Sequence, residues 1–108
     1  KIPSYKIEKI ESISGAFQQG KISVIVKNYP ESESLLLLCE KIMKEHTEFS
    51  NIVICVFSDT EIGQSLAKGN EENIYSEVQL DAWLAMYTYN SVEGTYFDDN
   101  PGGYLGAY

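Results

Sequence analysis

The last eleven residues, DDNPGGYLGAY, combine oxygen ligands for a cation with a turn sequence. Counted from Asp98, Asn100 takes the third position of an EF-hand loop and Gly103 the sixth, where such loops place an oxygen ligand and a glycine. Pro101 interrupts the loop, and the twelfth position, which needs a glutamate, lies beyond Tyr108. Proline and glycine suit the two central positions of a tight turn. We therefore expect a structural turn here and no metal site.

Aromatic residues gather in the same part of the chain. Five of the eight tyrosines lie after position 86, together with a phenylalanine and close to the single tryptophan. Aromatic side chains are common in strands because they pack well on a half-buried sheet face, and packing is the more general explanation. The alternative is an aromatic surface for a protein or glycan partner, which requires Tyr87, Tyr89 and Tyr96 to project together into solvent. The candidate partner-binding residues are Trp83, Tyr87, Tyr89, Tyr96 and Tyr104.

The sequence shows no familiar set of catalytic residues. The single histidine, His46, falls near the predicted end of a helix, where a structural role with the helix dipole outweighs catalysis. No Ser-His-Asp set, Cys-His set or glycine-rich phosphate loop stands out. Asp59, Glu61 and Asp98 could form a metal cluster if the chain brings them together, so a metal-dependent hydrolase remains an alternative. Caps and solvated turns explain these carboxylates adequately. We expect no catalytic residues and no cofactor.

The two cysteines, Cys39 and Cys55, fall in apolar segments, where burial disfavours the reactive thiolate. Their spacing matches neither a zinc site nor a redox pair. Two buried thiols are the simpler interpretation. A bridge between a helix and the strand behind it is the alternative, and it requires a narrow Cα separation.

The charge balance narrows the classes of partner. Sixteen acidic residues against eight lysines give a net charge of -8, and the chain has no arginine. This charge repels nucleic acid and anionic membranes, and without arginine the chain lacks the planar fork that often recognises phosphate. We therefore expect no nucleic-acid binding, and phosphorylated ligands are disfavoured. An acidic inhibitor or immunity-type protein that covers a basic enzyme is a second alternative.

Hydrophobic spacing predicts a single globular domain over residues 1–108. No apolar run approaches the roughly 20 residues that span a bilayer, so no transmembrane segment is expected in the visible sequence. The first half of the pattern indicates a strand at 5–13 with a bulge or an early end, a strand at 21–28, an amphipathic helix at 33–48 and a strand at 52–57. A short helix before Gly69, a polar loop at 69–77, and strands at 83–90 and 95–98 follow.

The apolar run at 52–57 identifies the centre of the sheet. It lacks alternation and is rich in β-branched residues, as in strands that are buried on both faces. The first two strands form an antiparallel hairpin, and a helical crossover makes the second strand parallel to the central one. The predicted fold is α+β with the order β-β-α-β-α-β-β, a small mixed sheet of four to five strands, and one long amphipathic helix packed on one face.

Two details of this fold can be predicted from local spacing. Ser58 and Glu61 have the spacing of a capping box for the short helix, and Asp59 and Thr60 can also cap it. In the strand at 83–90, alternation places Trp83 on the same face as Tyr87 and Tyr89.

Four segments in this order, KISVIVKN, SLLLLCEKI, NIVICVFSDTEIGQSLAKG and AWLAMYTYN, resemble small bacterial exported proteins of unknown function, which are often predicted to be lipoproteins. The resemblance covers most of the chain and rests on a pattern of elements rather than on a diagnostic motif. It implies a compact α+β domain and an extracytoplasmic location, either exported or lipid-anchored, and it brings no catalytic residues.

These features together favour a non-enzymatic, acidic binding domain of a bacterium that acts through surface contacts. The expected recognition surface is the last hairpin with its aromatic residues, beside the loop at 69–77.

Overall fold

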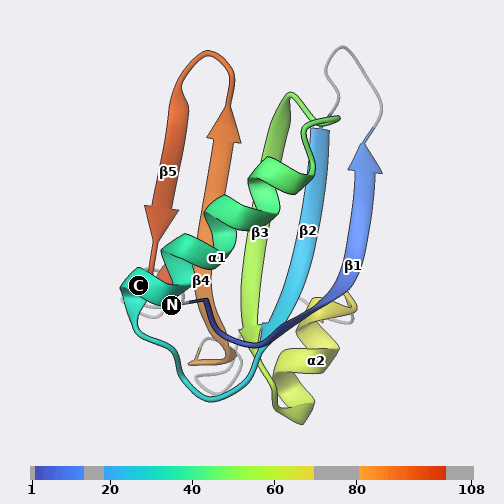
Figure 1. Ribbon diagram of the computed structural model, residues 1–108. Coiled ribbons are helices and arrows are strands. Elements are labelled where there is room, and N and C mark those ends of the chain that lie inside the picture. Colours follow the sequence, from blue (N-terminus) through green and yellow to red (C-terminus); the bar gives the residue numbers. More distant parts are fainter. Residues whose placement is uncertain (1, 14–18, 70–80, 102–108) are drawn as a thin grey trace, which may run out of the picture.

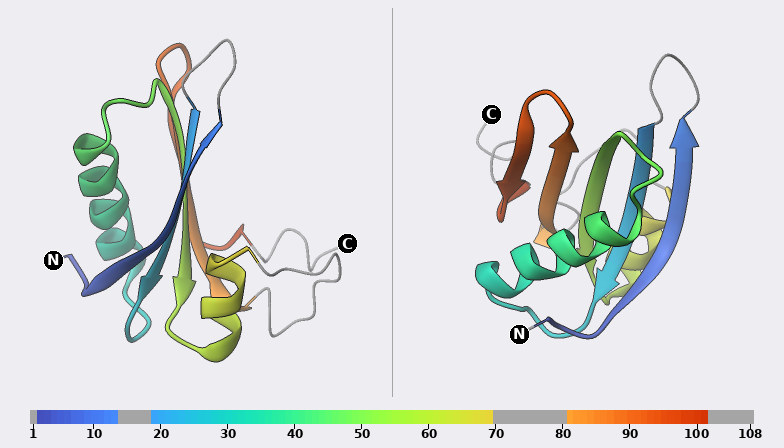
Figure 2. Two further views of the ribbon diagram at one scale, coloured as in Figure 1. Left: turned by 90° about the vertical axis from the view of Figure 1, so that its right-hand side faces the viewer. Right: turned by 45° about the horizontal axis from the view of Figure 1, so that its top comes forward.

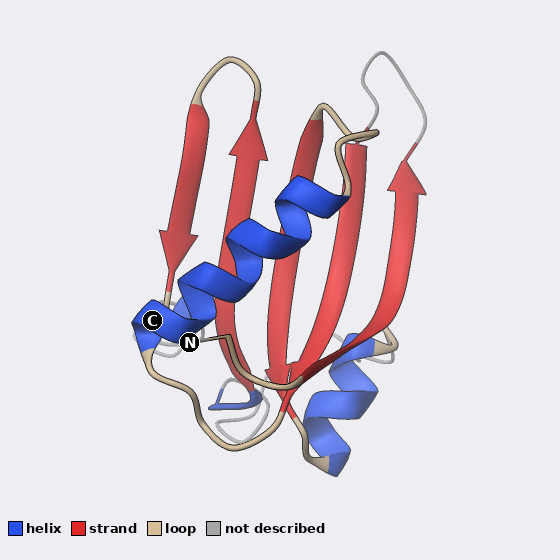
Figure 3. Ribbon diagram, viewed as in Figure 1, coloured by secondary structure: helices blue, strands red, loops and turns tan. Residues whose placement is uncertain are grey.

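The computed structural model describes residues 2–13, 19–69 and 81–101, and it shows a small α+β fold (Figure 1, Figure 3). A five-stranded mixed sheet carries one helix on each face (Figure 2). The strands are β1 (Tyr5–Ile13), β2 (Gln19–Val26), β3 (Asn51–Ser58), β4 (Trp83–Asn90) and β5 (Gly94–Asp98), and the helices are α1 (Ser32–Glu45) and α2 (Glu61–Ala67). The predicted loop at 69–77 falls outside the described residues except at its first position.

The order of the strands in the sheet follows their order in the chain. β2 and β3 are parallel, while the pairs β1–β2, β3–β4 and β4–β5 are antiparallel. The predicted hairpin, parallel pair and central strand are therefore confirmed. A shift of register between Ile7 and Lys9 also confirms the predicted bulge in β1.

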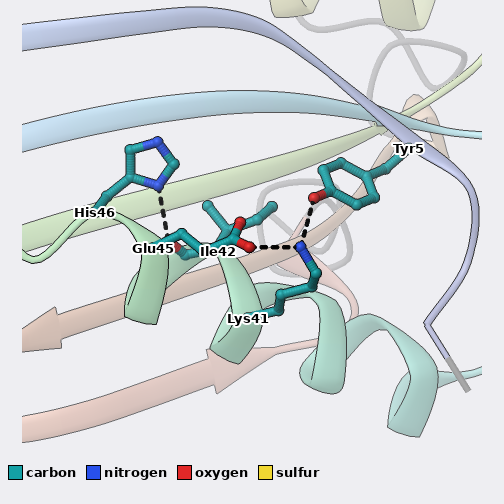
Figure 4. Close-up of polar contacts among 5 residues, drawn as sticks. All are labelled: Tyr5, Lys41, Ile42, Glu45 and His46. Atoms are coloured by element: carbon teal, nitrogen blue, oxygen red, sulfur yellow. Dashed lines mark hydrogen bonds and ion pairs between the residues drawn. The ribbon is translucent and has the colours of Figure 1, made fainter.

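The first helix crosses one face of the sheet diagonally (Figure 1). It has 14 residues and ends at Glu45, three residues before the predicted end, so the prediction of one long helix is not confirmed. His46 caps this end of the helix, and its backbone N–H donates to the Met43 carbonyl at 3.2 Å. The ring Nδ1 of His46 also donates to the Ile42 carbonyl at 2.8 Å (Figure 4). These bonds satisfy carbonyls that the end of a helix leaves without partners.

β3 connects the two hydrophobic clusters of the protein. Its residues Ile52, Ile54 and Val56 face α1, and Val53, Cys55 and Phe57 face α2. The cluster under α1 is the larger, and its fully buried members include Ile22, Val24, Leu38, Ile42 and Tyr87. Alternating side chains of a strand point to opposite faces, so an unbroken apolar run is what a strand covered on both sides requires.

A bulge changes the orientation of the first residue of β4. The pairing between β3 and β4 shifts register between Val56 and Phe57, opposite the start of β4. Because a shift of one residue moves a side chain to the other face, Trp83 packs with the α2 cluster while Tyr87 and Tyr89 pack with the α1 cluster. The prediction that these three aromatic residues share one face is therefore wrong. The indole nitrogen of Trp83 is buried and has no hydrogen-bond partner among the described residues.

The N-cap of the second helix is one of the two further candidates and not the predicted capping box. Thr60 is the N-cap, and its Oγ1 accepts the Gly63 N–H at 3.0 Å and hydrogen-bonds with Ser58 Oγ at 3.0 Å. The predicted capping box of Ser58 and Glu61 is wrong because β3 continues through Ser58. Gly63 lies directly over the main-chain oxygen of Ser58, so a Cβ at this position would clash with β3.

Polar contacts join α1 to the first strand (Figure 4). Lys41 Nζ donates to Glu45 Oε2 at 2.7 Å and to Tyr5 Oη at 3.0 Å. The hydrogen bond to Glu45 and the one to Tyr5 raise the pKa of Lys41, in that order. The contact links the beginning of β1 to a helix that packs mainly over β3 and β4.

Two tyrosines of the last hairpin provide a matched test of this core. Tyr87 is 1% exposed and Tyr96 is 54% exposed. We expect Tyr87→Ala to lower the free energy of unfolding by about 3–5 kcal/mol, because it removes a large buried side chain and leaves a cavity. Tyr96→Ala should lower it by less than about 1 kcal/mol, since only a cross-strand pair with Thr88 is lost. Urea unfolding followed by circular dichroism measures both values, and equal losses would contradict the assignment of faces.

Candidate functional site

The structure distributes the candidate aromatic residues over both faces of the sheet. Tyr87 belongs to the core under α1, and Tyr89 is partly buried against the same cluster. Trp83 is partly buried on the other face, and Tyr104 lies outside the described residues. Of the four that are described, only Tyr96 is largely exposed. The three tyrosines thus do not project together into solvent, because Tyr87 and Tyr89 point to the face that α1 covers.

The hairpin of β4 and β5 nevertheless has a well-defined outer part. Residues 91–96 are all exposed, including Val92, which is 90% exposed at the tip. The Asn90 side chain orders the turn, because its Oδ1 accepts the N–H of Val92 at 2.8 Å and that of Glu93 at 3.2 Å. Gly94 follows with a φ of +88°, which glycine adopts without strain. We call Val92 together with β5 the hairpin edge.

The two edges of the sheet differ in how well they resist pairing with another strand. β1 contains a bulge and alternating charges, with ion pairs from Lys6 to Glu8 at 3.4 Å and from Lys9 to Glu11 at 2.6 Å. Bulges and lysines on an edge strand hinder pairing with a further strand. β5 has a regular register with β4 and contains neither lysine nor proline. No described strand pairs with the outer side of β5, so its backbone is open to a partner there.

Acidic residues surround the hairpin edge. Glu93 lies in the turn, while Asp98 and Asp99 follow at the other end of β5. Asp98 Oδ1 accepts the N–H of Asn100 at 2.8 Å, the local bond typical of an Asx turn. The predicted turn thus has a hydrogen bond at its start, whereas its Gly103 lies outside the described residues. The edge is therefore an open strand in a negatively charged setting.

The carboxylates proposed for a metal-dependent hydrolase do not come together. Among the residues that the structure describes, no three His, Cys, Asp or Glu side chains form a group that could hold a metal ion. Asp59 instead accepts a hydrogen bond from Gln64 Nε2 at 2.7 Å. Glu61 lies in the first turn of α2, where the helix dipole favours an acid.

A hollow of about 770 Å³ opens beside the start of α2 and includes Tyr29, Thr60, Glu61 and Asp81 in its lining. The hydroxyl of Thr60 is already used in capping the helix, as described above.

Both cysteines are buried, and neither takes part in a disulfide. Cys39 points from α1 into one cluster and Cys55 points from β3 into the other. The proposed bridge is therefore wrong, because β3 lies between the two side chains. Burial raises the pKa of Cys39 to about 12, with smaller contributions from Cys55 and Glu40. The uncharged thiol of Cys39 is a packing group and not a nucleophile.

Comparison with known proteins found no matching family model, no matching curated protein and no matching solved structure. Within the described ranges, none of the helices combines the length and apolar character needed to cross a bilayer.

The raised pKa of Cys39 predicts a defined response to pH. The fold favours the protonated thiol, so this contribution to stability is complete below the ordinary pKa of 9.0 and is lost as the pH rises toward about 12.

Burial of the thiol also predicts slow chemical labelling. At pH 8 we expect Ellman's reagent to label Cys39 at least on the order of a hundredfold more slowly in the native protein than in guanidinium, because labelling needs opening of the core. Cys55→Ala isolates the Cys39 signal. Rapid, complete labelling of the native variant would show that this thiol is accessible.

Proposed function

We propose that this chain is a non-enzymatic binding domain that captures an extended segment of a partner protein along the hairpin edge. The observation that supports this is the contrast between the two sheet edges. β1 carries a bulge and paired charges, whereas β5 is regular, exposed and free of lysine and proline. An edge strand of this second kind accepts a further strand through main-chain hydrogen bonds.

The side chains at the edge suit this kind of contact. Tyr96 is 54% exposed and lies opposite Thr88 on the face away from α1. Exposed tyrosines contribute large contact areas with little loss of side-chain entropy, and they are enriched among residues that dominate binding energy. Val92 extends the apolar surface to the tip of the hairpin. An added strand would therefore gain side-chain contacts at the middle of β5, from Tyr96, and at the tip of the hairpin, from Val92.

The negative charge around the hairpin edge favours a partner segment with basic residues. Glu93, Asp98 and Asp99 lie at the two ends of β5, and the whole chain carries a net charge of -8. A bound segment that carries basic residues on either side of a short β-forming stretch would be complementary. A basic enzyme covered by an acidic inhibitor is one partner of this kind. Exposed charges of this kind are screened by salt. Association should therefore slow as the ionic strength rises above about 0.1 M, where the Debye length is about 10 Å.

Hydrogen exchange with selected peptides tests the proposal. Linear peptides selected on the immobilised protein by phage display should be rich in β-branched and basic residues, and binding should slow amide exchange in β5 while leaving β1 unchanged. We expect Tyr96→Ala to weaken binding about tenfold, as for a residue at the centre of a small interface. Residue-resolved exchange by NMR and fluorescence anisotropy measure the two effects.

Ile10→Ala is the control for this experiment. Ile10 is 48% exposed and lies on β1, at the opposite edge of the sheet from β5. Its replacement should leave the affinity of the peptides unchanged. Protection of β1 instead of β5, or equal losses for the Tyr96 and Ile10 variants, would contradict the proposal.

The location of the protein is part of the same proposal. The resemblance to exported bacterial proteins supports binding outside the cytoplasm. Fractionation of the source cells, with an antibody to this domain, should detect it in the membrane or secreted fraction. Detection only in the cytosolic fraction would reject this location and leave the binding experiment unaffected.

A further inference from the structure

A second surface, on the opposite edge of the sheet, gathers positive charge in an otherwise acidic protein. Lys6, Lys27 and Lys68 line one groove of about 370 Å³ between β1, the end of β2 and α2. Lys6 comes from β1, Lys27 follows β2 directly, and Lys68 follows α2 directly. The three residues are far apart in the sequence, so the groove exists only because α2 packs beneath β1 and β2 (Figure 1). We call it the lysine groove.

The lysine groove also contains two carboxylates. Glu8 forms an ion pair with Lys6 at 3.4 Å, and Asp59 accepts the hydrogen bond from the neutral Gln64 amide. Lys27 and Lys68 are both exposed, and within the described part of the chain neither has an ion pair or a hydrogen bond from its side chain. Three lysines against two carboxylates leave a net charge of +1 in the lining, and Lys27 and Lys68 are the lysines available to an anion.

The acidic residues of the first helix lie on the other side of the sheet. Glu33, Glu40 and Glu45 belong to α1, and Figure 2 shows α1 and α2 on opposite faces. Exposed charges separated by more than about 8 Å are largely screened at physiological ionic strength. The field inside the groove is therefore set by its own lysines more than by the net charge of -8.

We infer that the lysine groove binds a doubly charged tetrahedral oxyanion, as found in phosphate, sulfate and their esters. Lys27 and Lys68 offer such an anion two ammonium groups that form no ion pair with a described carboxylate, and the net positive charge of the lining favours an anion. Lysine acts as a point charge that can approach such an anion from any direction, whereas a planar carboxylate benefits most from the arginine fork that this chain lacks. The volume of the groove exceeds that of one oxyanion, and buried Ile25 in its lining offers an apolar contact for the organic part of an ester.

This inference differs from the expectation that phosphorylated ligands are disfavoured. That expectation used the total charge and the missing arginine, and neither describes the local arrangement of the lysines. The binding is independent of the proposed capture of a strand, because β1 and β5 are at opposite edges of the sheet.

Titrations followed by amide NMR test the inference. Inorganic phosphate, sulfate and glycerol 3-phosphate are added at constant ionic strength, with chloride as the comparison anion. We expect saturable shifts for the amides of Lys27, Gln64 and Lys68, and none with chloride. Lys27→Gln and Lys68→Gln should each weaken binding about two- to fivefold, as expected for one exposed charge pair. Lys44→Gln, on α1, is the matched control and should leave the affinity unchanged.

The pH and the ester distinguish between the oxyanions. Glycerol 3-phosphate gains its second negative charge near pH 6, so its affinity should rise between about pH 5 and pH 7.5 while that of sulfate stays constant. Tighter binding of the ester than of inorganic phosphate would identify phosphate esters as the ligand class, and equal binding would identify the free oxyanion. Equal shifts with chloride, or unchanged affinity in the double variant Lys27→Gln/Lys68→Gln, would overturn the inference.

Discussion

The fold depends on the burial of β3 from both sides. Ile52, Ile54 and Val56 contact the core under α1, and Phe57 and Cys55 contact the core beside α2. Each fully buried aliphatic side chain contributes about 1.5–3 kcal/mol through removal of apolar surface from water. A strand of this composition is stable only when both faces are covered, so the chain needs a helix on each side and a paired strand on each edge of β3. α1, α2, β2 and β4 meet these four needs.

The position of β3 also decides which parts of the molecule meet solvent. Because β3 is third of five, the sheet ends at β1 and β5 among the described strands. The two edge strands differ in how their sequences protect them against pairing with a further strand. β1 is protected by a bulge and by charged side chains, and α2 beside it turns the same region into a groove lined by lysines. β5 has none of this protection, and it follows directly from a turn that Asn90 and Gly94 shape. The two proposed binding surfaces are consequences of this difference.

Charge is arranged in the molecule in a way that total charge hides. Acids lie on α1, in the hairpin turn and at the ends of β5, whereas beside α2 the three lysines Lys6, Lys27 and Lys68 outnumber the two acids of the same groove, Glu8 and Asp59. An acidic edge and a basic groove on opposite sides of one small domain can bind ligands of opposite charge. At physiological salt, the two fields are screened from each other beyond about 8 Å.

Local sequence was sufficient for the order of elements, the central strand, the parallel pair and the bulge in β1, because each of these follows from hydrophobic spacing over a few residues. The sequence also showed that Cys39 is an unreactive packing group, since it lies on the apolar side of an amphipathic helix. The end of α1 at Glu45 and the Thr60 cap were predicted less accurately, because strand ends and caps compete for the same polar residues.

Only the tertiary structure decided which side chains lie together. The bulge beside Phe57 separates Trp83 from Tyr87, and α1 covers Tyr87, so the aromatic surface expected from composition is not formed. The lysine groove joins residues 6, 27 and 68, which no sequence pattern connects. The physical reason is that periodicity records which residues of one element share a face, whereas a site depends on how separate elements pack against each other.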